Sequence, residues 1–156
     1  ELAQELDKIP NLKAIFVPTS SGTTAQGLGE SFQTEFLQQK PQIHIVQTNT
    51  CHPIADHFQP DYLKNHPYAE ADKSIAGAIV DKTAFRKEKV IEIVGNSKGS
   101  GWIVENEDIK EAVELSKNGC HLAISPNSAL SIAGLKKAVE NDFSWDGNIV
   151  CLITGM

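Results

Sequence analysis

The sequence lacks the features that would place it in a membrane or on a nucleic acid. No apolar run approaches the roughly 20 residues that a membrane-spanning helix requires. Lysine and arginine number 14 against 20 aspartate and glutamate, and the net charge of −6 argues against a nucleic-acid or anionic-membrane partner. Local hydrogen-bond donors can still hold a small phosphorylated ligand, so that class of ligand stays open.

Cysteine is scarce, and its arrangement indicates reduced thiols. Cys51, Cys120 and Cys151 are odd in number and lie far apart in the sequence. The chain starts with charged residues and shows no signal peptide, so we expect a cytoplasmic location. A cysteine and three histidines cluster between residues 51 and 66, but their spacing matches no standard zinc pattern, and no metal site is predicted.

Two common phosphate-binding motifs are also missing. No lysine or arginine lies between Lys13 and Lys40, whereas a nucleotide P-loop needs a lysine directly before its Ser/Thr. The chain has no G-x-G-x-x-G motif, which argues against a dinucleotide ligand.

A strand, a small-residue loop and a helix follow one another near the start of the chain. Residues 13–17 form a continuous apolar run typical of a buried strand, and Pro18 ends it. Four of the five residues in the loop Ser20–Thr24 carry hydroxyls. A helix is predicted over residues 24–38, with one face formed by Ala25, Leu28, Phe32 and Phe36.

This loop suits the phosphate of a monoester. Free N–H groups at a helix N-terminus point toward an anion, and the helix dipole adds a partial positive charge. Serine and threonine hydroxyls add donors, and small side chains let the backbone approach the oxygens. An ordinary strand-to-helix turn would favour the same residue types, so the loop alone leaves both interpretations open.

The remaining chain alternates between strands and helices. Further strands are predicted at 42–47, 102–104, 121–124 and 148–153, and further helices at 1–8, 74–80, 87–94, 106–119 and from Ser125 onward. Asn106 is the expected N-cap of the 106–119 helix, and residues 48–72 are expected to be irregular. The inner face of the last helix is expected to contain Ala129, Ile132, Ala133 and Val139.

The strands are continuous apolar runs, which predicts a mostly parallel sheet covered by helices on both faces, a three-layer α/β/α domain. Ligands of such sheets bind at the carboxyl ends of the strands. Ser20–Thr24 follow the first strand and Thr154 follows the last one, so both can face one pocket.

Four segments in this order resemble the fold type II (tryptophan synthase β-like) pyridoxal-phosphate enzymes, and within them threonine synthase. Residues 17–27 (VPTSSGTTAQG) are similar to the family's phosphate loop. Residues 74–79 (SIAGAI) resemble its "TIATAI" segment, and residues 125–135 (SPNSALSIAGL) resemble "EPASAASLAGL". Residues 151–155 (CLITG) resemble the final "VLTGHG".

The resemblance implies pyridoxal 5'-phosphate as cofactor, with a role for six residues. The phosphate would be bound by Ser20, Ser21, Gly22, Thr23 and Thr24. Thr154 would place a hydroxyl at the pyridine nitrogen, where a neutral partner makes a weaker electron sink than a carboxylate does. Ser125 departs from the family, which often has glutamate there.

The family's Schiff-base lysine lies far upstream of the phosphate loop, and only Lys8 and Lys13 precede Ser20 here. Neither lies in a matching motif, so no catalytic residue is predicted in this chain. The resemblance implies that residues 1–156 form a single domain, the C-terminal, cofactor-phosphate-binding part of a longer enzyme whose N-terminal part carries the lysine.

The function implied for the parent enzyme is a pyridoxal-phosphate-dependent amino-acid lyase or synthase. Its chemistry would be threonine synthase-like elimination or replacement at the β or γ carbon of a small amino acid, in a homodimer. Two alternatives remain open: a serine/threonine dehydratase, and a domain that binds phosphate or the cofactor without catalysis.

Overall fold

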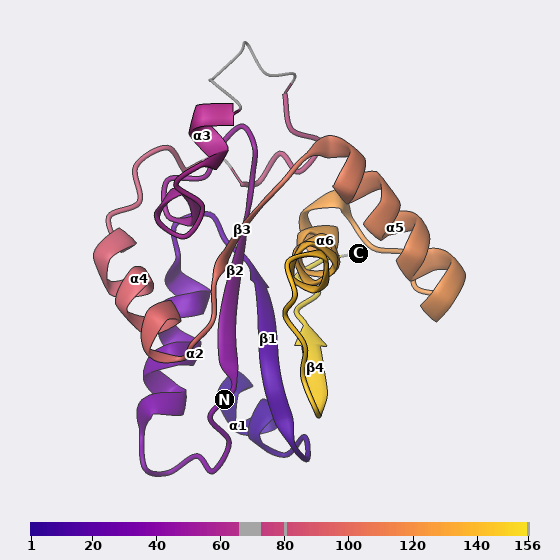
Figure 1. The fold of residues 1–156 in the computed structure, drawn as a ribbon. Helices are drawn as coiled ribbons and strands as arrows, with labels where there is room; N and C mark the ends of the chain where they lie inside the picture. Colours follow the sequence, from indigo (N-terminus) through magenta and orange to yellow (C-terminus); the bar gives the residue numbers. More distant parts are fainter. Residues whose placement is uncertain (66–72, 80, 156) are drawn as a thin grey trace.

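One parallel four-stranded sheet organises the chain. The computed structural model describes residues 1–65, 73–79 and 81–155. In chain order the elements are α1 (Leu2–Asp7), β1 (Leu12–Pro18), α2 (Thr23–Gln33), β2 (Gln42–Thr48), the 3-10 helix η1 (Ala55–His57), α3 (Tyr62–Asn65), α4 (Lys87–Asn96), β3 (Gly101–Val104), α5 (Asn106–Cys120), α6 (Pro126–Glu140) and β4 (Asn148–Cys151). The strand order is β3-β2-β1-β4, and each neighbouring pair among the described strands is parallel (Figure 1).

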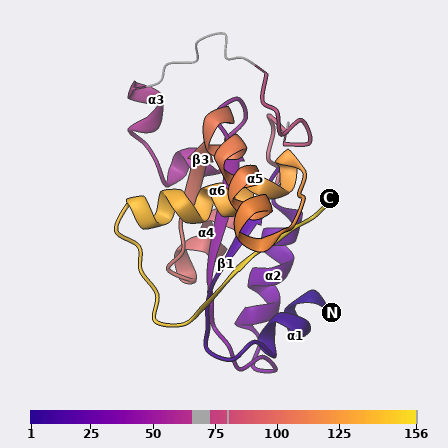
Figure 2. The ribbon, with the colours of Figure 1, turned by 90° about the vertical axis from the view of Figure 1, so that its right-hand side faces the viewer.

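Helices cover both faces of the sheet. α2 and α4, with α1 beside α2, lie on one face, and α6 lies on the other with α5 packed outside it (Figures 1 and 2). Consecutive β1 side chains, Ile15, Phe16 and Val17, are all fully buried because each face of the strand meets a helix layer. The α/β/α architecture predicted from the apolar runs is therefore confirmed.

Two hydrophobic clusters fill the space between these layers. Ile15 and Val17 pack toward α2 and α4, whereas Phe16 and Val46 pack toward α6. A Cβ at Gly134 would overlap the Val46 side chain, so the glycine lets α6 approach the sheet closely.

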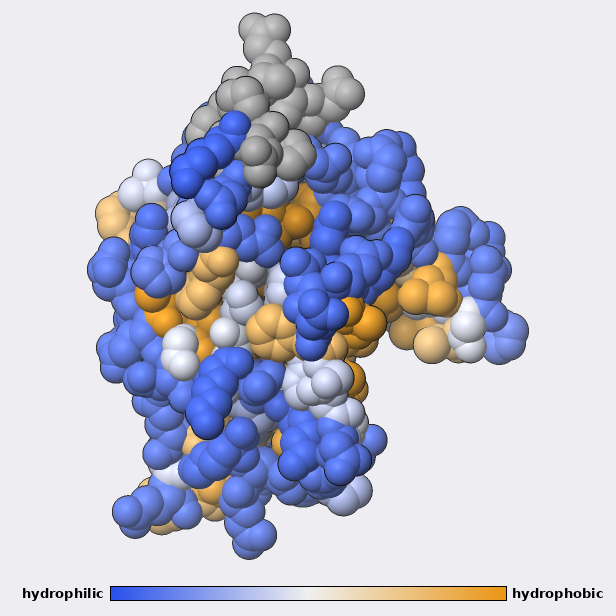
Figure 3. All heavy atoms as spheres, viewed as in Figure 1, coloured by the Kyte–Doolittle hydropathy of each residue, from blue (hydrophilic) through white to orange (hydrophobic). Residues whose placement is uncertain are grey.

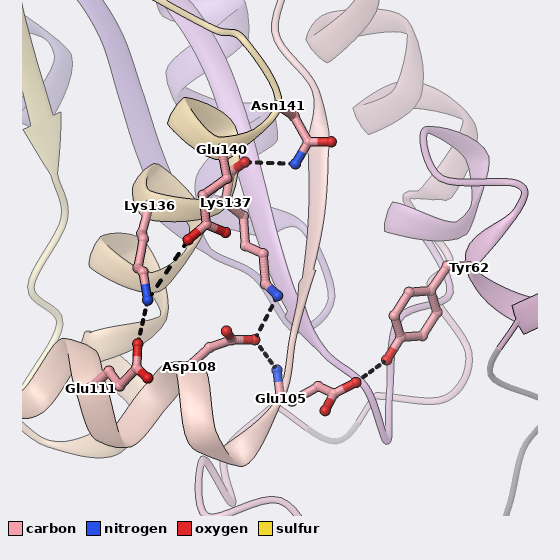
Figure 4. A network of polar contacts seen from close by, with 8 residues as sticks. All are labelled: Tyr62, Glu105, Asp108, Glu111, Lys136, Lys137, Glu140 and Asn141. Carbon is pink, nitrogen blue, oxygen red and sulfur yellow. Dashed lines mark hydrogen bonds and ion pairs between the residues drawn. The ribbon is translucent and has the colours of Figure 1, made fainter.

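The start of α5 joins three helices. Glu105 is the N-cap and forms a capping box with Asp108, whose Oδ2 accepts a hydrogen bond from Glu105 N at 2.8 Å. Lys137 of α6 forms an ion pair with Asp108 at 3.1 Å, and Tyr62 of α3 donates to Glu105 Oε1 at 3.3 Å (Figure 4). The prediction that Asn106 caps this helix is wrong, because Asn106 is its first helical residue.

Helix α2 ends earlier than predicted. It stops at Gln33, where Thr34 adopts an extended backbone, and Lys40 Nζ donates to the carbonyls of Phe32 and Thr34 at 2.6 and 2.7 Å. These contacts satisfy the last carbonyls, so no further turn is required. Phe36, expected on the buried face, is consequently 92% exposed.

Two further predicted elements are absent from the described residues. Residues 73–79 form turns instead of a helix, because tertiary contacts use their backbone amides, and Val80 lies outside the described residues. Residues 121–124 are no strand: His121 adopts a left-handed conformation that closes α5, and Ser116 Oγ donates to Leu122 O at 2.9 Å. In α6, Val139 is exposed rather than part of the inner face.

Surface hydropathy agrees with the layered fold. Hydrophilic residues cover most of the face drawn in Figure 3, with hydrophobic residues exposed mainly near its middle. Within the part of the chain that the structure describes, none of the helices has the length and apolar character that a bilayer span needs.

Candidate ligand site at the carboxyl ends of β1 and β4

The loops that follow β1 and β4 meet at one cavity. The chain leaves β1 through α2 on one face and reaches β4 only after α5 and α6 on the other, so the strand order reverses between these two neighbours. Such a switch point opens a crevice at the carboxyl ends of the strands. The cavity there has a volume of about 240 Å³ and is lined by Pro18, Thr19, Ser20, Ser21, Gly22, Thr23, Thr24, Ala25, Ala78, Ile79, Asn127 and Thr154.

All six residues predicted to bind the cofactor line this cavity. Ser20–Thr24 come from the β1–α2 loop and the start of α2, and Thr154 comes from the chain beyond β4. The tertiary structure thus brings together residues that are 130 positions apart in sequence. Their role in binding stays a prediction.

Gly22 sets the shape of the loop. It is the N-cap of α2 and has a φ of +92°, a left-handed conformation that favours glycine. A Cβ on Gly22 would lie 2.7 Å from Val90 Cγ2, so α4 also packs too closely for a side chain. Both constraints require glycine at this position.

The backbone amides of the loop are available to a ligand. Among the residues that the structure describes, none accepts a hydrogen bond from the amides of Ser20 to Ala25, and the first helical bond is Gln26 N to Gly22 O at 2.9 Å. These donors lie at the N-terminus of an 11-residue helix, whose dipole favours an anion.

Hydroxyl groups complete the donor set. Ser21 Oγ and Thr23 Oγ1 lie 3.2 Å apart, while Ser20 Oγ accepts a hydrogen bond from Asp81 N at 3.3 Å. None of the described residues that line the cavity is ionisable. The donor set is therefore entirely neutral, which fits the phosphate of a monoester held by amides and hydroxyls and not by lysine.

Gln47, which was not predicted from the sequence, supports the β1–α2 loop through side-chain hydrogen bonds. Its side chain is fully buried in β2, where Nε2 donates to Ser20 O at 3.3 Å. Its Oε1 accepts from Ile54 N and Ala55 N, both at 2.9 Å. A glutamine inside an otherwise apolar strand was the available signal, since buried polar side chains need partners.

Ser128, also missed, fixes the position of Thr154. Its buried Oγ accepts from Thr154 N at 3.1 Å and from Gly155 N at 2.9 Å, and it donates to Gly155 O at 2.6 Å. Ser125 caps α6 as predicted, through Ser128 N. One hydroxyl at the start of α6 thus anchors the chain beyond β4.

Ser128→Ala is expected to lower the free energy of unfolding by about 2 kcal/mol, because it leaves two amides without their acceptor. Urea unfolding checks this value. Ser131→Ala is the matched control: Ser131 Oγ is buried in the same helix but only donates to Ser128 O at 2.9 Å, so its loss leaves no donor orphaned. An equal cost for both variants would contradict the anchoring role of Ser128.

The histidines and cysteines do not form a metal centre in the described part of the chain. No three His, Cys, Asp or Glu side chains gather there. His52 Nδ1 pairs with Asp56 instead, and Cys51 is buried at the end of β2. His66 lies outside the described residues.

A parallel α/β sheet with a neutral donor cavity at its switch point is typical of proteins that bind phosphorylated ligands. Residues 1–155 match the pyridoxal-phosphate dependent enzyme family, and the chain belongs to this family. Pyridoxal phosphate is the family's cofactor, so the resemblance and the cofactor predicted from the sequence are confirmed.

Relatives of this chain are longer proteins. It is 28% identical over 146 residues to threonine synthase from Methanocaldococcus jannaschii, covering 90% of this chain and 36% of that protein. Its fold is similar to an L-serine ammonia-lyase from Rhizomucor miehei (TM-score 0.69, 19% identity, covering 99% of this chain and 48% of the other). It is also similar to threonine deaminase isoform 2 from Solanum lycopersicum (TM-score 0.71, 18% identity, 99% and 41%). The chain therefore spans between a third and a half of the length of these relatives.

Proposed function

We propose that this chain holds the cofactor of a pyridoxal-phosphate-dependent amino-acid lyase or synthase with threonine synthase-like chemistry. The observation that carries the proposal is the cavity in which the free amides from Ser20 to Ala25 and the residue Thr154 lie together. The 28% identity to a threonine synthase supports the reaction class. The substrate would be a small amino acid that undergoes elimination or replacement at its β or γ carbon.

The cavity residues bind and orient in this proposal. The amides and hydroxyls of Ser20–Thr24 hold the phosphate, and the helix dipole of α2 offsets part of its charge. The Thr154 hydroxyl would be the partner of the pyridine nitrogen, and a neutral hydroxyl would not hold a proton there as a carboxylate does. When bound, pyridoxal phosphate supplies an electron sink for the substrate carbon.

We further propose that the lysine that anchors the cofactor lies outside residues 1–156. Within the part of the chain that the structure describes, no lysine lines the cavity. Lys8 pairs with Glu5 at 2.6 Å on the surface. Lys13 lies five residues before Pro18, about 16 Å away along an extended strand, and lines a different hollow with Trp145. Residues 1–156 alone would then have no catalytic activity.

Borohydride reduction of the full-length protein tests both points. The protein should absorb at about 410 nm. Reduction with borohydride should link the cofactor covalently to one lysine, which peptide mapping identifies. A labelled lysine outside residues 1–156 is expected. A label within these residues, or a protein that binds no cofactor, contradicts the proposal.

Product analysis separates the reaction classes. Formation of threonine by the full-length protein supports the synthase reaction. Release of ammonia from serine or threonine without threonine formation assigns it to the dehydratase alternative. Cofactor binding without turnover of any amino acid indicates the non-catalytic domain.

A further inference from the structure

Residues 73–79 form a wall of the cavity and are held by two asparagines. Asn106, the first residue of α5, accepts from Ile75 N at 3.0 Å and donates to Lys73 O at 3.3 Å. Asn127, in the first turn of α6, accepts from Ala78 N at 3.0 Å. Two helix starts thus fix one irregular segment against the cavity.

The two asparagines differ in whether their side-chain Nδ2 already donates a hydrogen bond. A backbone N–H can only donate, so the Asn127 atom facing Ala78 must be Oδ1, and the orientation of the amide is fixed. Asn106 uses both ends of its amide within this segment. Asn127 Nδ2 makes no hydrogen bond to the part of the chain that the structure describes, and Asn127 lines the cavity whereas Asn106 does not.

The surroundings of Asn127 suit a ligand oxygen. The cavity holds the free loop amides and Thr154, and none of the described residues that line it is charged, so each polar group that these residues offer is neutral.

We propose that Asn127 is a further cofactor-contacting residue, whose Nδ2 donates a hydrogen bond to an oxygen of pyridoxal phosphate while its Oδ1 holds Ala78. The inference rests on the proposed function, because it needs the cofactor in this cavity. Asn127 would link the α6 start and residues 73–79 to the same ligand that the β1–α2 loop holds. Binding would then tighten contacts between three separate parts of the chain.

Asn127→Asp separates these two roles in the full-length protein. The carboxylate still accepts from Ala78 N, but the donor is replaced by a negative charge facing an anionic ligand. We expect the dissociation constant for pyridoxal phosphate, measured by equilibrium dialysis, to rise about tenfold or more. Thermal unfolding without cofactor should stay close to that of the parent protein.

Asn106→Asp is the matched control, since it keeps the acceptor for Ile75 N and lies outside the cavity lining. Its affinity for the cofactor should be unchanged. The alanine pair provides a second comparison if Asn127→Asp does not fold: Asn127→Ala should weaken binding severalfold, and Asn106→Ala should not.

Two results would overturn this inference: parent-like cofactor affinity in the Asn127 variants, or an equal loss in the Asn106 variants, which would trace the effect to the segment. Failure of the parent protein itself to bind pyridoxal phosphate would instead refute the proposed function. The two failures are thus distinguishable in one experiment.

Discussion

Gly22→Ala is expected to weaken pyridoxal-phosphate binding about a hundredfold or more and to lower the free energy of unfolding by about 3 kcal/mol. Alanine is strained at a φ of +92°, and its Cβ would lie 2.7 Å from Val90 Cγ2. Relief requires the loop to turn away from α4. That movement would misdirect the amides of Ser20 to Ala25, which carry the proposed phosphate contact.

Cofactor titration and urea unfolding measure the two effects of this variant. Gly27→Ala, in the same helix, is the control, because nothing lies within 4 Å of a Cβ at that position. It should bind the cofactor normally and be more stable by up to about 1 kcal/mol, since alanine favours a helix. Normal binding by Gly22→Ala would show that the loop amides do not hold the phosphate.

His44 is expected to make the protein lose about 3 kcal/mol of stability as the pH falls from 6.5 to 4. Burial lowers the pKa of His44 to about 4 in the folded chain, against an ordinary value of 6.5. Its Nδ1 accepts from Ser100 N at 3.2 Å and from Trp102 Nε1 at 3.1 Å, and its ring stacks on Phe16 with centroids 4.5 Å apart. Protonation of Nδ1 would place a third N–H donor opposite the Ser100 and Trp102 donors and remove their acceptor.

The direction of this pH dependence follows from which state, folded or unfolded, binds the proton at His44. Between pH 4 and 6.5 the unfolded chain binds a proton at His44 that the folded chain does not, so stability rises with pH across this window. Above about 6.5 both states carry a neutral imidazole, and the contribution is fully present.

Urea unfolding at several pH values tests this expectation. His44→Gln should be less stable than the parent at pH 7, and its stability should fall less steeply between pH 6.5 and 4. Parallel slopes for the parent and His44→Gln would contradict the assignment.

The four strands of the sheet were predictable, because each contains consecutive apolar residues, whereas the strand predicted at 121–124 is absent. Ile15, Phe16 and Val17 are apolar without alternation, and a strand covered on both faces needs this pattern. The start of α6 after Ser125 was equally predictable, because serine followed by proline satisfies a helix start locally.

Elements whose amides are used by distant side chains were not predictable. Residues 74–80 have a helix-like composition. However, the N–H of Ile75 donates to Asn106, 31 positions away, and the N–H of Ala78 donates to Asn127, 49 positions away. Phe36 has helical spacing from Phe32, but Lys40 caps α2 before it. For residues 74–79 a tertiary contact outweighs a local preference worth only a few tenths of a kcal/mol per residue, and for α2 a lysine just beyond the helix does so.

For the site, sequence supplied the loop chemistry and the order of the four family-like segments, because hydroxyls, glycine and a missing lysine are local facts. It also supplied Thr154, through its position after the last strand. The supports Gln47, Ser128 and Asn127 came only from the structure, since each acts through a partner far along the chain.

The sequence by itself determined a parallel α/β domain with a loop of small residues at the end of its first strand, because burial and backbone freedom act residue by residue. Only the tertiary structure decided that β4 lies beside β1, which places Thr154 and Ser21 in the lining of the same cavity. Strand order depends on which helices cross which face of the sheet. The packing of the whole domain sets the strand order, so the sequence of no single segment indicates it.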